Sequence, residues 1–175
     1  MKMLKGVIFV LGGLFIMATI MGLLMPGKVV ITNAEPMTGD SAKIFEQVSD
    51  LRNWKNWQPV FKADSGQVNF STASGQVNSF AEWTTNGKKN RLLIAEKKYP
   101  FVKILLEREG ETDVVNIISL MQVQEQGNMQ VRWDVITKLG WLPWQRFGGL
   151  FIERMSGPGY ETALKSLKEY IEAHQ

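Results

Sequence analysis

The stretch 143–174, PWQRFGGLFIERMSGPGYETALKSLKEYIEAH, repeats apolar residues at helical spacing along its length. It predicts one long helix with an apolar face, and in the second half the charged residues fall on the opposite side. Gly157-Pro158-Gly159 is expected to bend or break this helix, because proline lacks a backbone N–H. Such a face has to be buried against another element. The residues predicted to form it are Trp144, Phe147, Gly148, Phe151 and Met155, followed by Tyr160, Ala163, Leu164, Leu167, Tyr170 and Ile171.

The chain before this helix, from about residue 66 to 138, predicts about six strands. The clearest is 129–137, in which Met129, Val131, Trp133 and Val135 alternate with more polar residues, and Val102, Ile104 and Leu106 alternate likewise. Short turns between strands require antiparallel pairing, so we expect an antiparallel sheet curled around the C-terminal helix. The turn signals are Asn86-Gly87, Tyr99-Pro100, Glu109-Gly110 and Gly127-Asn128.

The segment 29–59 predicts a first strand and two short helices. The β-branched run 29–32 is the strand, and 35–40, with Pro36 and Gly39, is interpreted as a connection. Asp40 is placed to cap a helix whose apolar face is Ile44, Phe45, Val48 and Leu51. A second short helix or turn follows and should end at Pro59.

The N-terminal segment 1–27 predicts a transmembrane anchor that precedes a domain of residues 28–175. Residues 6–25 carry no charge and, as a helix, would span about 30 Å, the thickness of a bilayer's hydrocarbon core. A cleaved signal peptide is the alternative, but the run is long for one and lacks small residues at a cleavage site. Lys2 and Lys5 favour a cytoplasmic N-terminus, which would place the domain on the extracytoplasmic side.

Three groups of residues form an ordered set of short motifs: Ile44-Phe45 with Val48, Asp50, Trp54, Trp57 and Pro59, then Val131-x-Trp133, and Gly157 to Lys168 with its Leu164-x-x-Leu167-Lys168 ending. This set resembles the START-like helix-grip superfamily, also called SRPBCC or polyketide cyclase/dehydrase and lipid-transport proteins, in particular its membrane-anchored bacterial members. The resemblance covers residues 28–173 and implies an α+β fold. In that fold, about seven antiparallel strands grip the C-terminal helix around an apolar cavity. The superfamily includes lipid carriers, cyclases and hormone receptors, so the resemblance leaves the function open.

The composition argues against several classes of function. Without Lys2 and Lys5 the domain has 18 basic and 17 acidic residues, which gives no support for nucleic-acid binding. The chain has no cysteine, and its one histidine is the penultimate residue, His174. The sequence therefore offers no Ser-His or Cys-His nucleophile, no His- or Cys-based metal site, and no cofactor motif. The remaining route to an enzyme is a cyclase- or dehydratase-like site in which Glu82 or Arg108 acts inside an apolar pocket.

The leading hypothesis is a membrane-tethered domain that binds a hydrophobic small molecule or lipid between the sheet and the C-terminal helix. The alternatives are the enzyme just described and a scaffold that has a filled core and acts through protein contacts. The scaffold remains open because aromatic residues at strand and helix spacing suit a simple core as well as a pocket wall. Trp141 and Trp144, on either side of Pro143, are additional candidates for contact with the membrane interface. The candidate pocket residues are Trp54, Trp57, Glu82, Trp83, Arg108, Asn116, Trp133, Phe147, Phe151 and Met155.

Overall fold

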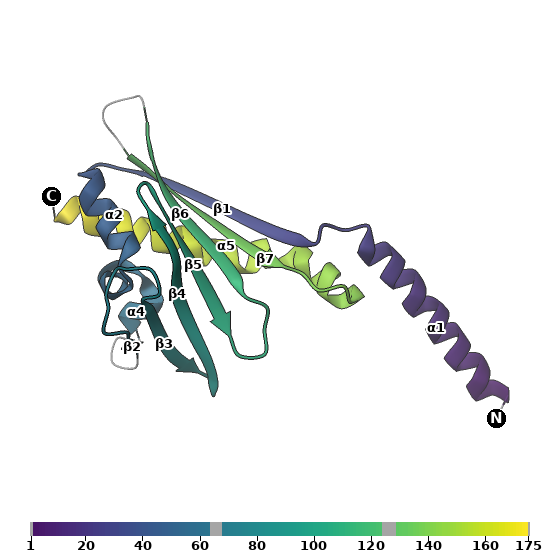
Figure 1. The fold of residues 1–175 in the computed structure, drawn as a ribbon. Helices are drawn as coiled ribbons and strands as arrows, with labels where there is room; N and C mark the ends of the chain where they lie inside the picture. Colours follow the sequence, from purple (N-terminus) through teal and green to yellow (C-terminus); the bar gives the residue numbers. More distant parts are fainter. Residues whose placement is uncertain (1, 64–67, 124–128, 175) are drawn as a thin grey trace.

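A seven-stranded antiparallel sheet and one long helix dominate the structure (Figure 1). The structure is a computed structural model that describes residues 2–63, 68–123 and 129–174. The strand order β1-β7-β6-β5-β4-β3-β2 leaves β1 and β2 at the edges. The elements are α1 Lys2–Leu23, β1 Lys28–Met37, α2 Ser41–Ser49, the 3₁₀ helix η1 Leu51–Asn53, α3 Trp54–Trp57, α4 Pro59–Ala63, β2 Asn69–Phe70, β3 Phe80–Thr85, β4 Lys88–Lys98, β5 Phe101–Arg108, β6 Val114–Gln122, β7 Met129–Lys138 and α5 Pro143–Ala173.

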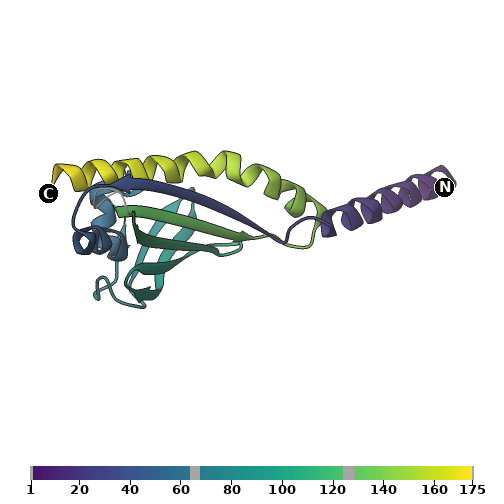
Figure 2. The same cartoon turned by 90° about the horizontal axis from the view of Figure 1, so that it is seen from above.

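The sheet curves beneath α5, which runs along it from end to end (Figure 2). Alternation decides which side chains face the helix: Val102, Ile104 and Leu106 of β5 are buried, as are Val131 and Trp133 of β7. The predicted curved antiparallel sheet around a C-terminal helix is therefore confirmed.

The hairpin β3–β4 shows how local sequence sets the strand boundaries. Asn86 and Gly87 have φ values of 53° and 75°, the left-handed conformations that a two-residue hairpin turn requires. Tyr99-Pro100 joins β4 to β5, and the turn with Glu109-Gly110 joins β5 to β6, as predicted. The predicted turn at Gly127-Asn128 lies outside the described residues.

Strand β1 is longer than predicted. It continues through Pro36 to Met37, so residues 35–37 of the predicted connection belong to the strand, and only residues 38–40 connect it to α2. β1 is an edge strand that pairs with β7, and an edge strand tolerates a proline whose missing N–H would face away from its neighbour.

The short helices are held together by side chains that bond to the backbone. Asp40 caps α2 as predicted, its carboxylate accepting the Ala42 N–H at 3.1 Å. Trp54 and Trp57 donate their indole N–H groups to the Val48 and Gln47 carbonyls at 3.1 and 3.2 Å. These carbonyls belong to the last turn of α2, where helix carbonyls lack partners within the helix. The two indoles therefore fill the core and also complete the end of α2.

The second half of α5 is buried as predicted, through Ala163, Leu164, Leu167 and Ile171. The helix is continuous through Pro158, so it is not broken there, although it curves along its length (Figure 2). Pro158 is exposed, and water can reach the backbone groups that a proline leaves without a helical partner.

The first half of α5 presents a different face to the sheet from the one predicted. Trp144, Phe151 and Met155 are exposed, whereas Gly149 is buried and Ile152 packs against the core. This half has apolar residues on two sides, so periodicity could not decide which one is buried. The close approach at Gly149, where a Cβ would meet Leu139 and Val29, selects the observed side.

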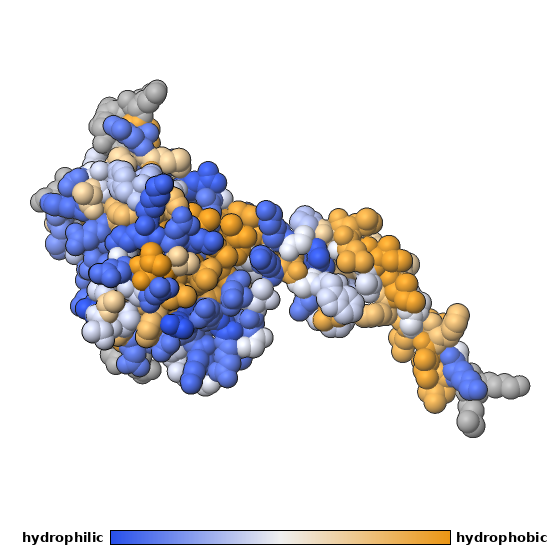
Figure 3. Space-filling view, in the orientation of Figure 1, coloured by the Kyte–Doolittle hydropathy of each residue, from blue (hydrophilic) through white to orange (hydrophobic). Residues whose placement is uncertain are grey.

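Helix α1 lies outside the domain (Figure 1). Met3–Leu23 is long and apolar enough to cross a membrane, and only 6% of its most apolar window is buried. Its apolar surface forms a continuous hydrophobic band in the space-filling view (Figure 3). The prediction of an N-terminal helix of membrane-spanning length is confirmed.

Candidate ligand pocket

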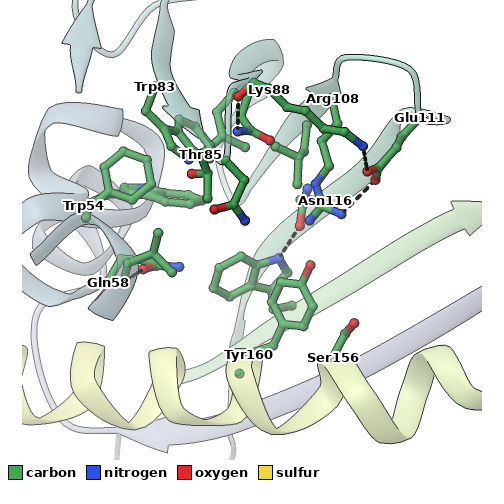
Figure 4. Close-up of a pocket in the computed structure, with 18 residues that line it drawn as sticks. Trp54, Gln58, Trp83, Thr85, Lys88, Arg108, Glu111, Asn116, Ser156 and Tyr160 are labelled. Atoms are coloured by element: carbon green, nitrogen blue, oxygen red, sulfur yellow. Dashed lines mark hydrogen bonds and ion pairs between the residues drawn. The ribbon is translucent and has the colours of Figure 1, made fainter. Parts of the chain in front are cut away.

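A cavity of about 600 Å³ lies between the sheet, the short helices and α5 (Figure 4). Its lining comes from α3 and α4, from strands β3 to β7, and from α5. Ligand pockets typically have volumes of about 300–1,000 Å³, with mostly apolar walls and a few placed polar groups. This cavity has the size and the mixture of walls of a small-molecule site.

The apolar wall is built from aromatic rings in edge-to-face contact. The ring centroids of Trp54 and Trp133 are 5.6 Å apart, and Phe61 lies 5.8 Å from Trp54 and 5.4 Å from Trp83. Leu92 and Leu106 complete this wall from β4 and β5. Mutual packing fixes the rings, so they offer an apolar surface that needs little ordering when a ligand arrives.

Charged residues stand at the opposite end of the cavity. Lys88 and Arg108 each approach the Glu111 carboxylate at 3.4 Å. All three side chains are partly exposed, so these pairs contribute little to stability. They give the cavity one polar end with two cations and one anion, and therefore a net positive charge.

Asn116 is the one amide buried in the pocket wall among the described residues, with a relative exposure of 2%. Its Oδ1 accepts the indole N–H of Trp133 at 3.1 Å, and its Nδ2 makes a longer contact of 3.4 Å with the Val114 carbonyl. The indole N–H can only donate, so this bond fixes which way round the amide lies.

Tyr160 of α5 closes the pocket from the helix side, its ring centroid 5.1 Å from that of Trp133. Burial raises the pKa of the Tyr160 hydroxyl, and the positive charge of Arg108 partly opposes that shift. At neutral pH the hydroxyl is therefore a neutral hydrogen-bonding group at the pocket wall.

Five of the ten candidate residues line this cavity: Trp54, Trp83, Arg108, Asn116 and Trp133. Trp57 is fully buried in the core outside the lining.

Glu82 lies on the outer face of the sheet, 3.4 Å from Arg91, because its neighbours Ala81 and Trp83 take inward positions of β3. Glu82 is therefore not placed to act as a catalytic carboxylate inside this pocket. Phe147, Phe151 and Met155 do not line the cavity either, because they lie on the other side of α5.

The polar groups of the pocket that the sequence did not predict include Lys88, Glu111 and the Tyr160 hydroxyl. Lys88 begins β4 and Glu111 lies in the turn between β5 and β6, positions where a charged residue normally signals solvent. Tyr160 was predicted to belong to the buried helix face, and nothing in the local sequence distinguishes a pocket position from a core position there.

A second cavity of about 380 Å³ continues along α5. It shares Arg108, Glu111, Ser156 and Tyr160 with the first cavity. From there its lining runs along α5 to Gln145 and to the β7–α5 connection at Leu139 and Gly140. The two cavities therefore adjoin one another along the groove between the sheet and α5.

No family model and no curated protein matches this chain. Solved structures do. A protein of unknown function from Staphylococcus aureus has a TM-score of 0.64 at 13% identity, with 84% of this chain and 95% of that chain covered. The major latex-like protein 151 of Panax ginseng has a TM-score of 0.54 at 15% identity, over 85% and 98% of the two chains. The protein DynU16 of the dynemicin biosynthetic locus has a TM-score of 0.58 at 11% identity, over 83% of this chain and 48% of that one.

The chain has the helix-grip fold. At these identities the likeness concerns the fold alone, and function has to be argued from the pocket.

Proposed function

We propose that this protein is a membrane-tethered domain that binds a hydrophobic small molecule or lipid in the cavity between the sheet and α5. The observation that carries the proposal is the combination of an aromatic wall, at Trp54, Trp83 and Trp133, with one charged end, at Lys88 and Arg108. A ligand with an apolar body and a single polar or anionic group matches both ends. The aromatic wall desolvates the body, while the cations at the open end meet the polar group.

The unfilled volume supports ligand binding over a scaffold with a filled core. The core residues behind the cavity, such as Trp57, Ile104 and Leu167, are already fully buried, so the domain does not need to close this space to be stable.

The membrane tether is the second part of the proposal. Helix α1 would cross the bilayer, with the N-terminus in the cytoplasm and the domain on the other side. The absence of cysteine allows a direct test, because a single cysteine at exposed Thr72 would be the only thiol. We expect a membrane-impermeant maleimide to label Thr72→Cys in intact cells stripped of any outer barrier. Labelling that requires membrane rupture would overturn the orientation.

Binding can be tested with a dansyl-labelled fatty acid added to the full chain in detergent micelles. When bound, the probe should accept excitation energy from the pocket tryptophans. Ser156→Phe, which adds a ring to the wall shared by both cavities, should weaken binding, whereas Glu153→Phe, at an exposed position of the same helix, should not. Equal signals from both variants and from empty micelles would count against the proposed function.

A further inference from the structure

The β7–α5 connection and the first turn of α5 are bonded to the segment that joins α1 to β1. The Leu139 N–H donates to the Gly27 carbonyl at 2.9 Å. Arg146 donates from Nη1 to the Met25 carbonyl at 3.0 Å and from Nε to the Gly140 carbonyl at 2.7 Å. A Cβ on Gly22 would lie 3.5 Å from the Cα of Pro143, so the two helices are in close contact there. The segment 139–147 is therefore held in place relative to α1.

This segment reaches well down the side of α1. The ring centroids of Trp144 and Phe15 are 6.4 Å apart. Phe15 precedes the end of α1 at Leu23 by eight residues, or about 12 Å along a helix axis. A helix that spans the bilayer with the window Met3–Leu23 would have Phe15 inside the hydrocarbon region, and Trp144 lies beside it.

The side chains of segment 139–147 suit lipid better than water. Trp141 and Trp144 are each 61% exposed, and Leu139, Leu142 and Phe147 are also apolar. Tryptophan is enriched where a protein meets the membrane interface. The single charge, on Arg146, bonds to two backbone carbonyls, and its remaining N–H groups can reach lipid phosphates.

The same segment forms one end of the groove along α5. Leu139, Gly140 and Gln145 line the second cavity, and Gly148 lines it one helical turn further on. The shared residues Ser156 and Tyr160 then lead into the first cavity.

We propose that segment 139–147 is inserted in the bilayer interface beside α1, so that the groove opens onto lipid and the pocket takes its ligand from the bilayer. The ligand class is then a membrane-dissolved amphiphile. This part of the inference rests on the proposed binding function, whereas the insertion stands independently of it.

Insertion can be measured by tryptophan quenching in the full chain reconstituted into phosphatidylcholine–phosphatidylglycerol nanodiscs. α1 contains no tryptophan, and Trp54, Trp57 and Trp133 are buried, so lipid quenching should report on Trp141 and Trp144. Lipids brominated on their acyl chains should quench the wild type, and most of that loss should disappear in Trp141→Phe/Trp144→Phe. Trp83→Phe is the control and should be quenched like the wild type. Equal emission in brominated and unbrominated nanodiscs would overturn the proposal, and a dimer cross-linked through this surface would assign it to a second copy of the chain instead.

Loading through the groove can be followed with a diazirine-bearing fatty acid in the same nanodiscs. After irradiation, mass spectrometry should find adducts both in segment 139–147 and on the pocket wall at Trp83 or Tyr160. Gly148 lines the second cavity and a Cβ there meets no atom within 4 Å, so Gly148→Leu should occupy the cavity and reduce the pocket adducts while leaving those of the segment. Pocket adducts that Gly148→Leu leaves unchanged would overturn the loading route. Segment adducts without pocket adducts in the wild type would remove the proposed binding function and leave the insertion in place.

Discussion

The indole N–H of Trp133 on β7 donates a 3.1 Å hydrogen bond to Oδ1 of Asn116 on β6, and both side chains are almost completely buried. The bond joins two adjacent strands in the wall of the pocket, where the strand register places Trp133 opposite Ile118 and Asn116 opposite Val135. Trp133 also contacts Trp54, Trp57 and Tyr160, so this one bond fixes the ring around which the pocket is assembled.

Asn116→Leu should destabilise the protein by about 1–3 kcal/mol, because the buried indole N–H of Trp133 would lose its acceptor. Thermal unfolding of the full chain in detergent, followed by near-ultraviolet circular dichroism, measures the effect. The double variant Asn116→Leu/Trp133→Phe is the control, since it removes both partners. Its cost should be smaller than the sum of the two single costs; strict additivity would show that the bond does not contribute.

Leu167→Ala should cost about 2–5 kcal/mol, because it opens a cavity at a fully buried position between α5 and the sheet. Leu150→Ala is the matched change at an exposed position of the same helix and should stay within about 0.5 kcal/mol. The same unfolding measurement compares them. Similar losses for the two variants would mean that the sheet does not hold the second half of α5.

Tyr160 should make stability depend on pH in the alkaline range. Its folded-state pKa is raised above the ordinary value of 10.0, so the folded state keeps the proton that the unfolded chain gives up. The resulting stabilisation is complete below pH 10.0 and is lost as the pH rises through the raised value. Tyrosinate absorbance should show a late phase that is absent from Tyr160→Phe and present in Tyr170→Phe. A late phase that survives in Tyr160→Phe would contradict the burial of this hydroxyl.

Arg108→Gln should weaken binding of the dansyl-labelled fatty acid and leave binding of its methyl ester nearly unchanged, because the ester carries no charge for the guanidinium to meet. Arg91→Gln removes the same charge from the outer face, where Arg91 is paired with Glu82, and is the matched control. Titration of each variant in detergent gives the comparison. If both variants weaken acid binding equally, the effect comes from net charge alone and Arg108 does not meet the ligand's acidic group.

Strand alternation and turn chemistry predicted most of the fold. The inward residues of β5, β6 and β7 follow period two, and Asn116 stood out as a polar residue in an apolar strand. The length of β1 was missed, because a proline at an edge strand and a proline in a loop cannot be told apart from local sequence. The need to bury the apolar face of the C-terminal helix predicted that the sheet curls around it, and the resemblance pointed to the same arrangement.

The pocket was less predictable than the fold. Glu82 and Trp83 are neighbours on β3 and face opposite sides, so the outcome depended on a one-residue choice of register. The first half of α5 was assigned the wrong buried face because residues such as Phe151 and Met155 are as apolar as those that face the sheet. Lys88 and Glu111 are brought together by the pairing of strands β4 and β5, which places the β3–β4 and β5–β6 turns at the same end of the sheet.

The most direct test of ligand binding is mass spectrometry of organic extracts from the purified full chain, with Ser156→Phe purified in parallel. A hydrophobic compound with one polar or acidic group should co-purify with the wild type in near-stoichiometric amount and be depleted from the variant. A wild type that carries no such compound, or a variant that carries the same amount as the wild type, would contradict the claim that the groove between sheet and helix is a binding site.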